Sequence, residues 1–123
     1  MTLRECYRQM GGNYDDVVGR FYSEPLVGRF LIKFLEDPCF EQLTEAFAAG
    51  NVKDAFCAAH TLKGICQNLS LGGLGRPLVE MTERLRAEDL EGGRELLEEV
   101  QRNYHNTIRA IRSYQENPEE SGQ

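Results

Sequence analysis

His60 is the residue of this sequence whose setting most clearly predicts chemistry. It lies in residues 51–69, where apolar residues repeat with the period of an α-helix. At about 100° per residue, one sector of that helix collects the apolar side chains, with Ala55, Ala59, Leu62, Cys66 and Leu69 at its centre and Ala58 and Ile65 at its edges. His60 lies about 140° from the centre of this sector. We therefore expect an exposed imidazole, which is a nucleophile near neutral pH.

Two residues that follow His60 complement its chemistry. Lys63 comes three residues later, so its ammonium can reach an anion attached to the imidazole. Gly64 comes four residues later, next to His60 on the exposed side, although glycine inside a helix costs about 1 kcal/mol relative to alanine. A small residue there leaves the approach to the imidazole open. The three residues predict a nucleophile that accepts a charged group from another macromolecule; the alternative is a solvated histidine beside a solvated lysine.

The elements that position these residues are predicted to be helices. Alternating apolar and polar residues, which would indicate strands, are lacking. Helix-capping residues precede several expected helices: Thr2 with Glu5, Asn13, Ser23 before Glu24-Pro25, and Asn51 with Asp54. Helix-ending signals are Gly11-Gly12, Asp37-Pro38 and Gly50.

Glycine-rich segments divide the second half of the chain. We expect residues 72–75 to form a flexible turn, with Pro77 in the first turn of the helix that follows. Gly92-Gly93 is expected to separate that helix from a last long helix, whose stripe consists of Leu97, Val100, Tyr104, Ile108 and Ile111.

These elements predict an all-α fold, an antiparallel up-down four-helix bundle with short extra N-terminal helices. We expect one domain over residues 1–114, with short helices in 2–22 and the bundle in 24–114. Residues 115–123 are polar, contain no core residue and are expected to be a disordered tail. The bundle needs no second chain to bury its core, so a monomer is expected.

Charge and composition restrict the partners. The 123 residues include 14 Lys and Arg against 20 Asp and Glu, a net charge of −6, which argues against nucleic acid as a partner. Residues 55–79 nevertheless contain no Asp or Glu, while Lys63 and Arg76 are present, so the segment around His60 is locally cationic. The sequence shows neither a secretion signal nor an apolar run of membrane-spanning length, and we expect a cytoplasmic protein that does not contact the membrane.

Four cysteines are expected to be reduced thiols in that compartment. Cys57, His60 and Cys66 lie within ten residues of each other, which leaves a zinc site as an alternative. The same helical geometry weakens it, because Cys66 points toward the core and His60 away from it. We expect no metal and no cofactor on this chain.

The run Ala59-His60-Thr61-Leu62-Lys63-Gly64, followed by Asn68-Leu69, resembles the signature of histidine-containing phosphotransfer (HPt) domains. The likeness extends over most of the chain, including residues 34–37 and the turn at 49–51. It implies a four-helix bundle that relays phosphoryl groups between response-regulator receiver domains, or between a hybrid histidine kinase and a regulator. By the resemblance, His60 is phosphorylated at Nε2, Lys63 helps hold the phosphoryl group, Gly64 lets the receiver dock, and Asn68 matches a motif position.

The resemblance also has gaps. The family often has glycine after Asn-Leu, where this chain has Ser70. Many members hold the imidazole Nδ1 with a polar residue of the next helix, for which Glu80, Thr82 and Glu83 are candidates, and we leave this role unassigned.

Docking is expected to use residues around His60. Phe56, Gln67 and Asn68 are the expected binding residues, and Phe34 or Phe40 would extend the apolar surface unless they pack in the core. His105, beside Tyr104, is expected to be an ordinary surface histidine.

The expected role is that of a carrier, not an enzyme. The sequence has no nucleotide-binding glycine pattern and no carboxylate cluster suited to Mg²⁺, so the resemblance assigns the Mg²⁺ to the partner receiver domain. The alternative function is a helical protein-docking module that works without phosphorylation.

Overall fold

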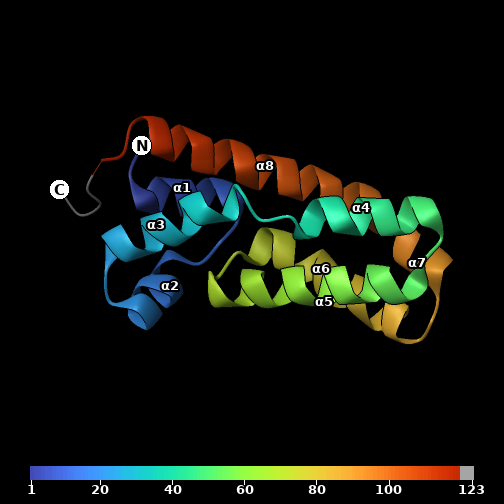
Figure 1. The fold of residues 1–123 in the computed structure, drawn as a ribbon. Coiled ribbons are helices and arrows are strands. Elements are labelled where there is room, and N and C mark those ends of the chain that lie inside the picture. Colours follow the sequence, from blue (N-terminus) through green and yellow to red (C-terminus); the bar gives the residue numbers. More distant parts are fainter. Residues whose placement is uncertain (120–123) are drawn as a thin grey trace.

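The computed structural model describes residues 1–119, and within them eight α-helices form without a β-strand. Their bounds are α1 Leu3–Met10, α2 Tyr14–Phe21, α3 Glu24–Phe34, α4 Cys39–Ala49, α5 Val52–Asn68, α6 Gly72–Arg86, α7 Leu90–Arg94 and α8 Leu97–Glu116 (Figure 1). The prediction of an all-α helical bundle is confirmed. In this part of the chain, no helix combines the length and the apolar character needed to cross a membrane.

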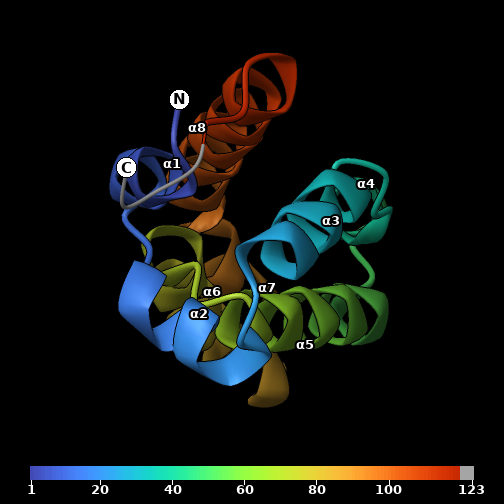
Figure 2. The same ribbon diagram turned by 90° about the vertical axis from the view of Figure 1, so that its left-hand side faces the viewer.

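The helices pack around one core. The closest packing is between α5 and its two neighbours, α4 and α6, while α8 contacts α1, α3 and α6. Figure 1 shows α3 and α4 end to end, alongside α8. Viewed along the helices, α1 lies beside α8 and α2 lies near one end of α5 and α6 (Figure 2). The N-terminal helices belong to the core, because Leu3, Cys6 and Tyr7 of α1 are fully buried.

Helix starts are placed by local hydrogen bonds, as predicted. The side chains of Thr2, Asn13, Ser23 and Asn51 each accept a hydrogen bond from a backbone N–H in the first turn of their helix. Gly11 and Gly50 end α1 and α4 in the left-handed conformation, with φ of 68° and 70°. The expected break at Asp37-Pro38 separates α3 from α4.

The glycine-rich segment 72–75 is helical rather than a flexible turn, which corrects the sequence prediction. It forms the first turn of α6. A Cβ on Gly73 would lie 2.4 Å from the Met10 carbonyl oxygen, and one on Gly75 would lie 3.4 Å from the Cβ of Cys66. These glycines therefore allow close approach of α6 to α1 and α5, a reason that depends on the tertiary fold.

Pro77 lies inside α6, not in its first turn. Proline lacks the N–H that would bond to the carbonyl oxygen four residues earlier, that of Gly73. The Nδ2 group of Asn103, from α8, donates to this oxygen at 3.1 Å. A side chain of a different helix thus satisfies the carbonyl that Pro77 leaves free.

Asn103→Ala is expected to lower the free energy of unfolding by about 1–2 kcal/mol, because the partly buried Gly73 carbonyl loses its partner. Urea unfolding measures the change. The matched control is Asn106→Ala on the same helix, whose Nδ2 donates to the Gln9 carbonyl in an exposed position. We expect less than about 0.5 kcal/mol there. Equal losses in the two variants would contradict the role of Asn103.

Gly92 and Gly93 also differ from the prediction, because they lie buried within α7 instead of separating two helices. A Cβ on Gly93 would lie 2.8 Å from the Cδ2 atom of Leu85. The carboxylate of Asp89 caps the helix by accepting from the Gly92 N–H at 2.9 Å. A Cβ on Gly92 would lie 2.0 Å from an oxygen of that carboxylate. Gly92 is thus required by the cap of α7, and Gly93 by the packing of α7 against α6.

The polar segment expected to be disordered from residue 115 is ordered up to residue 119. Residues 115 and 116 complete α8, and the Glu119 N–H donates to the Met1 carbonyl at 3.0 Å. The Glu119 carboxylate also pairs with the Met1 ammonium at 2.6 Å. A prediction from local composition cannot detect a contact between two residues that lie more than a hundred positions apart in the chain. Residues 120–123 lie outside the described residues.

Candidate functional site

The imidazole of His60 is exposed on the side of α5 that faces away from the core. On the opposite side of α5, Ala55, Ala59 and Leu62 are fully buried and Cys66 is 1% exposed. The helical geometry of the sequence therefore placed both sides of α5 correctly. A partner can reach His60 without any rearrangement of the bundle.

Phe56, one turn before His60, forms one wall of the site. The two ring centroids are 5.6 Å apart and the rings are tilted by 37°. The guanidinium of Arg86, from the end of α6, lies 5.0 Å from the centroid of the Phe56 ring. Phe56 is half-buried between an imidazole and a cation, which fixes its position beside His60.

Arg86 is a site residue that the sequence reasoning missed. Its Nε lies 3.4 Å from the Glu83 carboxylate, a pair on the surface of α6. Only the packing of α6 against α5 brings this cation to Phe56, so no local pattern in the sequence points to it. Arg86 thus supports the Phe56 wall beside His60, while its charge is paired with that of Glu83.

Lys63 lies one turn after His60 and is half-buried. Among the ion pairs found within residues 1–119, none involves its ammonium. The carboxylates of the adjacent α6 are already paired, Glu80 with Arg84 and Glu83 with Arg86. The charge of Lys63 is therefore available to an incoming anion.

Gly64 is exposed, and a Cβ built on it would meet nothing within 4 Å. This sets it apart from Gly73 and Gly93, where neighbouring atoms exclude a side chain. Packing within the chain does not require glycine at position 64. The space above it is open to a second molecule.

The candidates for holding the imidazole Nδ1 are occupied elsewhere. Thr82 is fully buried, and its hydroxyl donates to the Leu78 carbonyl at 2.7 Å. Glu80 and Glu83 pair with arginines of their own helix. Within residues 1–119, none of the three forms a hydrogen bond to His60.

Gln67 and Asn68 are exposed but lie about 10–12 Å beyond His60 along the helix axis. Gln67 lines a groove of about 620 Å³ between the end of α5, the α1–α2 turn and α6. Asn68 lines a smaller groove of about 280 Å³ against α3. At about 100° per residue, Gln67 lies about 20° from His60 around the helix and Asn68 about 80°, toward α3, and neither is next to the imidazole.

The two phenylalanines expected to extend the docking surface pack against α8 instead. Phe34 is 3% exposed, with its ring centroid 6.1 Å from that of Tyr104. Phe40 stacks on the same tyrosine, with centroids 3.9 Å apart and 9° between the planes. The alternative of core packing is therefore correct for Phe34, while Phe40 is half-buried and packs against the edge of the core.

Ser70 links the end of α5 to α2. Its backbone is left-handed, with φ of 57°, which explains why glycine suits this position. Its hydroxyl donates to the Asp16 carboxylate at 2.6 Å, and Arg20 donates to the Asn68 carbonyl at 2.7 Å. The Ser70 hydroxyl and Arg20 together lower the pKa of the Asp16 carboxyl below its ordinary value. These bonds hold α2 against α5 and offset the unfavourable backbone of Ser70.

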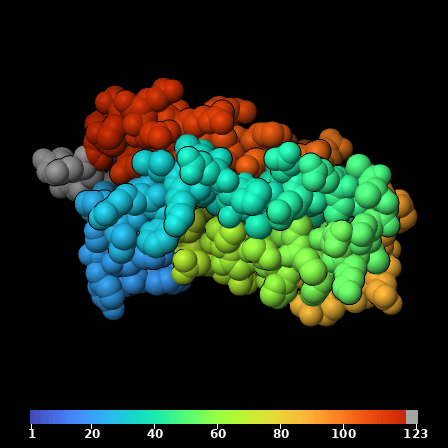
Figure 3. All heavy atoms as spheres, in the orientation of Figure 1, coloured from blue at the N-terminus to red at the C-terminus, as the bar shows by residue number. Residues whose placement is uncertain are grey.

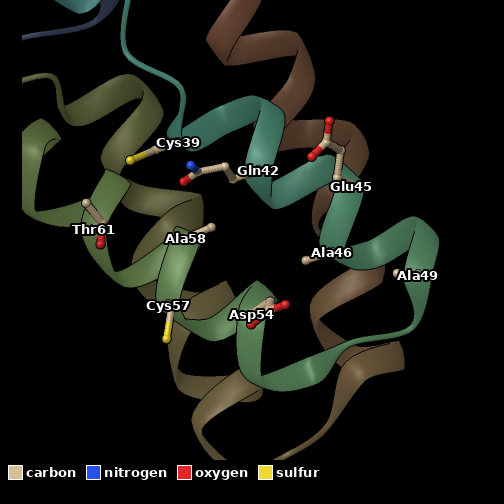
Figure 4. Close-up of a pocket in the computed structure, with 9 residues that line it drawn as sticks. All are labelled: Cys39, Gln42, Glu45, Ala46, Ala49, Asp54, Cys57, Ala58 and Thr61. Atoms are coloured by element: carbon tan, nitrogen blue, oxygen red, sulfur yellow. The ribbon is translucent and has the colours of Figure 1, made fainter.

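The zinc alternative has little support in this geometry. Cys66 is buried against the core, and burial raises the pKa of its thiol to about 12, which disfavours the thiolate that binds metal. Cys57 is exposed at a groove of about 490 Å³ between α4 and α5, and its side chain and that of Cys39 point in different directions (Figure 4). No cluster of three potential ligands occurs among residues 1–119.

The site thus combines an exposed histidine, a lysine that forms no ion pair within residues 1–119 and a glycine open to solvent, all on one side of a helix in a helical bundle. The family model of the Hpt domain matches residues 30–113, which is more than half of the chain. The chain therefore belongs to the Hpt domain family, whose members take part in histidine phosphotransfer within phosphorelays. Comparisons with curated proteins and with solved structures gave no match.

Proposed function

We propose that this protein is an intermediate of a phosphorelay, in which His60 accepts a phosphoryl group from the aspartyl phosphate of a receiver domain and passes it to another receiver. The observation that carries this proposal is the exposed imidazole of His60, which lies between open space at Gly64 and the ammonium of Lys63, a group without an ion pair in residues 1–119. A receiver domain or a hybrid histidine kinase is the proposed partner. We propose the cytoplasm as the location.

In the proposed transfer, neutral His60 is the nucleophile. The lone pair of Nε2 forms a bond to phosphorus while the bond between phosphorus and the aspartate oxygen breaks, and the carboxylate leaves with that electron pair. The reverse step delivers the phosphoryl group to a second aspartate. Only the unprotonated Nε2 carries the lone pair that attacks phosphorus.

Lys63 is proposed to stabilise the charge on the phosphoryl oxygens during transfer, as a preorganised cation does. The partner receiver supplies the acidic pocket and the Mg²⁺. This chain contributes the acceptor nitrogen, the cation and the docking surface. It acts as substrate and carrier, without an ATP site of its own.

Incubation with a phosphorylated receiver domain and Mg²⁺ tests the proposal. We expect label to leave the receiver and appear on this chain as an acid-labile, base-stable phosphoramidate. The alternative, a docking module that works without phosphorylation, predicts a complex with the receiver and no transfer of label. That result would overturn the proposal.

Lys63→Met is expected to lower the transfer rate about tenfold to a hundredfold, because the transition state loses a nearby positive charge. The matched control is Lys53→Met, which removes the same charge from the same helix about 10 Å from His60, at the limit of screening by salt. Rapid-quench kinetics with one phosphorylated receiver measures both variants. Equal rates for the two would show that Lys63 acts only through the general charge of α5.

A further inference from the structure

Three aromatic side chains lie at the junction of α2 and α3, and we call them the aromatic patch: Tyr22 and Phe30, which are exposed, and Phe21, which is half-buried against the core. Tyr22 is 88% exposed and Phe30 is 38% exposed. The rings of Phe21 and Phe30 contact each other, with centroids 5.2 Å apart. Grouped aromatic side chains that remain open to water are typical of surfaces that bind another protein.

The backbone of Tyr22 indicates that folding alone does not explain this residue. Its φ is 61°, in the left-handed region that L-residues other than Asn, Asp and Gly adopt at a cost. Asparagine or glycine would suit the end of α2 better, and neither would expose an aromatic ring to water. A bulky, exposed side chain at a strained position points to a role outside the chain.

The aromatic patch is connected to the surface that carries His60. Arg20, adjacent to Phe21 in the chain, donates to the Asn68 carbonyl at the end of α5. Phe30 and Asn68 line the same groove, together with Ile65. In Figure 3 the blue and cyan surface of α2 and α3 adjoins the yellow-green surface at the end of α5. The patch and the His60 side of α5 therefore form a continuous surface.

The distances allow one partner to cover both. Asn68 is eight residues after His60, about 12 Å along the helix axis. A standard protein interface buries about 800 Å² on each partner, which corresponds to a disc of about 16 Å radius. A receiver domain centred on His60 thus reaches the edge of α5 where the aromatic patch lies.

We infer that the aromatic patch selects among receiver domains, by packing against an apolar area beside the phosphorylated aspartate of the preferred receiver. This inference rests on the proposed function. Phe21 and Tyr22 lie outside residues 30–113, the part matched by the family model. Two of the three residues of the aromatic patch therefore lie outside the matched region, where selection between partners can differ without altering the residues that transfer the phosphoryl group.

The test compares the wild-type chain with the double variant Tyr22→Asn/Phe30→Gln. Several phosphorylated receiver domains that label the wild type serve as donors. For the fastest receiver, we expect transfer below saturation to slow about tenfold or more, on the scale of losing an interface aromatic residue. The maximal rate at saturation stays unchanged, since His60 is intact. Receivers that transfer more slowly to the wild type should lose a smaller fraction of their transfer rate. The ratio of transfer rates between the fastest and the slower receivers therefore becomes smaller.

Two controls accompany the test. Ile32→Gln removes an apolar side chain of similar exposure, 36%, from α3 on the side about 160° away from Phe30, and it should leave every rate unchanged. Tyr22→Asn alone changes an exposed side chain at a position that asparagine tolerates, so it folds even if the double variant does not.

Unchanged preference between receivers, or an equal loss with every receiver, would overturn the role of the aromatic patch while leaving the proposed function intact. If no receiver labels the wild-type chain, the proposed function itself fails.

Discussion

His60→Gln is expected to reduce phosphoryl acceptance from a receiver to below about a thousandth of the wild-type rate, the scale on which removal of a nucleophile acts. Glutamine has no nitrogen lone pair that can attack phosphorus. The bundle should fold unchanged, because the imidazole is exposed and its described contact is with the ring of Phe56. Transfer kinetics, with circular dichroism and urea unfolding in parallel, measures both expectations.

His105→Gln is the control for this prediction. His105 lies on α8, where its ring contacts those of Phe40 and Tyr104. We expect its variant to accept phosphoryl at the wild-type rate. Label that persists in His60→Gln would contradict the assignment, and loss of label in His105→Gln alone would move the acceptor to α8.

Gly64→Gln is expected to make the protein more stable and the transfer slower. Replacing glycine in an exposed helix interior should raise the free energy of unfolding by about 0.5–1 kcal/mol, since the new side chain meets nothing in the chain. The same side chain occupies the approach to His60, so we expect transfer from a receiver to fall about tenfold to a hundredfold. Urea unfolding and transfer kinetics on the same preparation measure the two effects.

Gly19→Gln is the matched control for the stability change. Gly19 is exposed in α2, and a Cβ there would also meet nothing within 4 Å. The Gly19→Gln variant should therefore show a similar increase in the free energy of unfolding. If Gly64→Gln transfers at the wild-type rate, the glycine is not needed for access to His60.

Features fixed by neighbours in the chain were predictable from the sequence. The N-cap hydrogen bonds of Thr2, Asn13 and Asn51 each join residues three apart, and the exposure of His60 follows from the period of one helix. Features that depend on contacts with other helices could not be predicted from the sequence. The glycines of α6 and α7 appeared to be turn residues because their close approach to Met10 and Leu85 exists only in the packed bundle.

The residues of the candidate site also fall into two groups, those positioned by a single helix and those brought together by packing between helices. His60, Lys63 and Gly64 lie within five residues of one helix, so their arrangement could be predicted from spacing. Arg86 reaches Phe56 from α6 through tertiary packing. The aromatic patch joins α2 to α3, and the hydrogen bonds from Arg20 to Asn68 and Ser70 hold α2 against the end of α5, which no pattern within a single helix reveals.

The most direct test of the central claim is to locate the phosphoryl group after transfer from a phosphorylated receiver. The chain contains two histidines, so mass spectrometry of peptides kept at alkaline pH can assign the modification to one of them. We predict a single phosphohistidine at His60, formed as the label leaves the receiver and lost when an unphosphorylated receiver is added. Phosphate on His105, or a stable complex in which neither histidine is modified, would contradict the account.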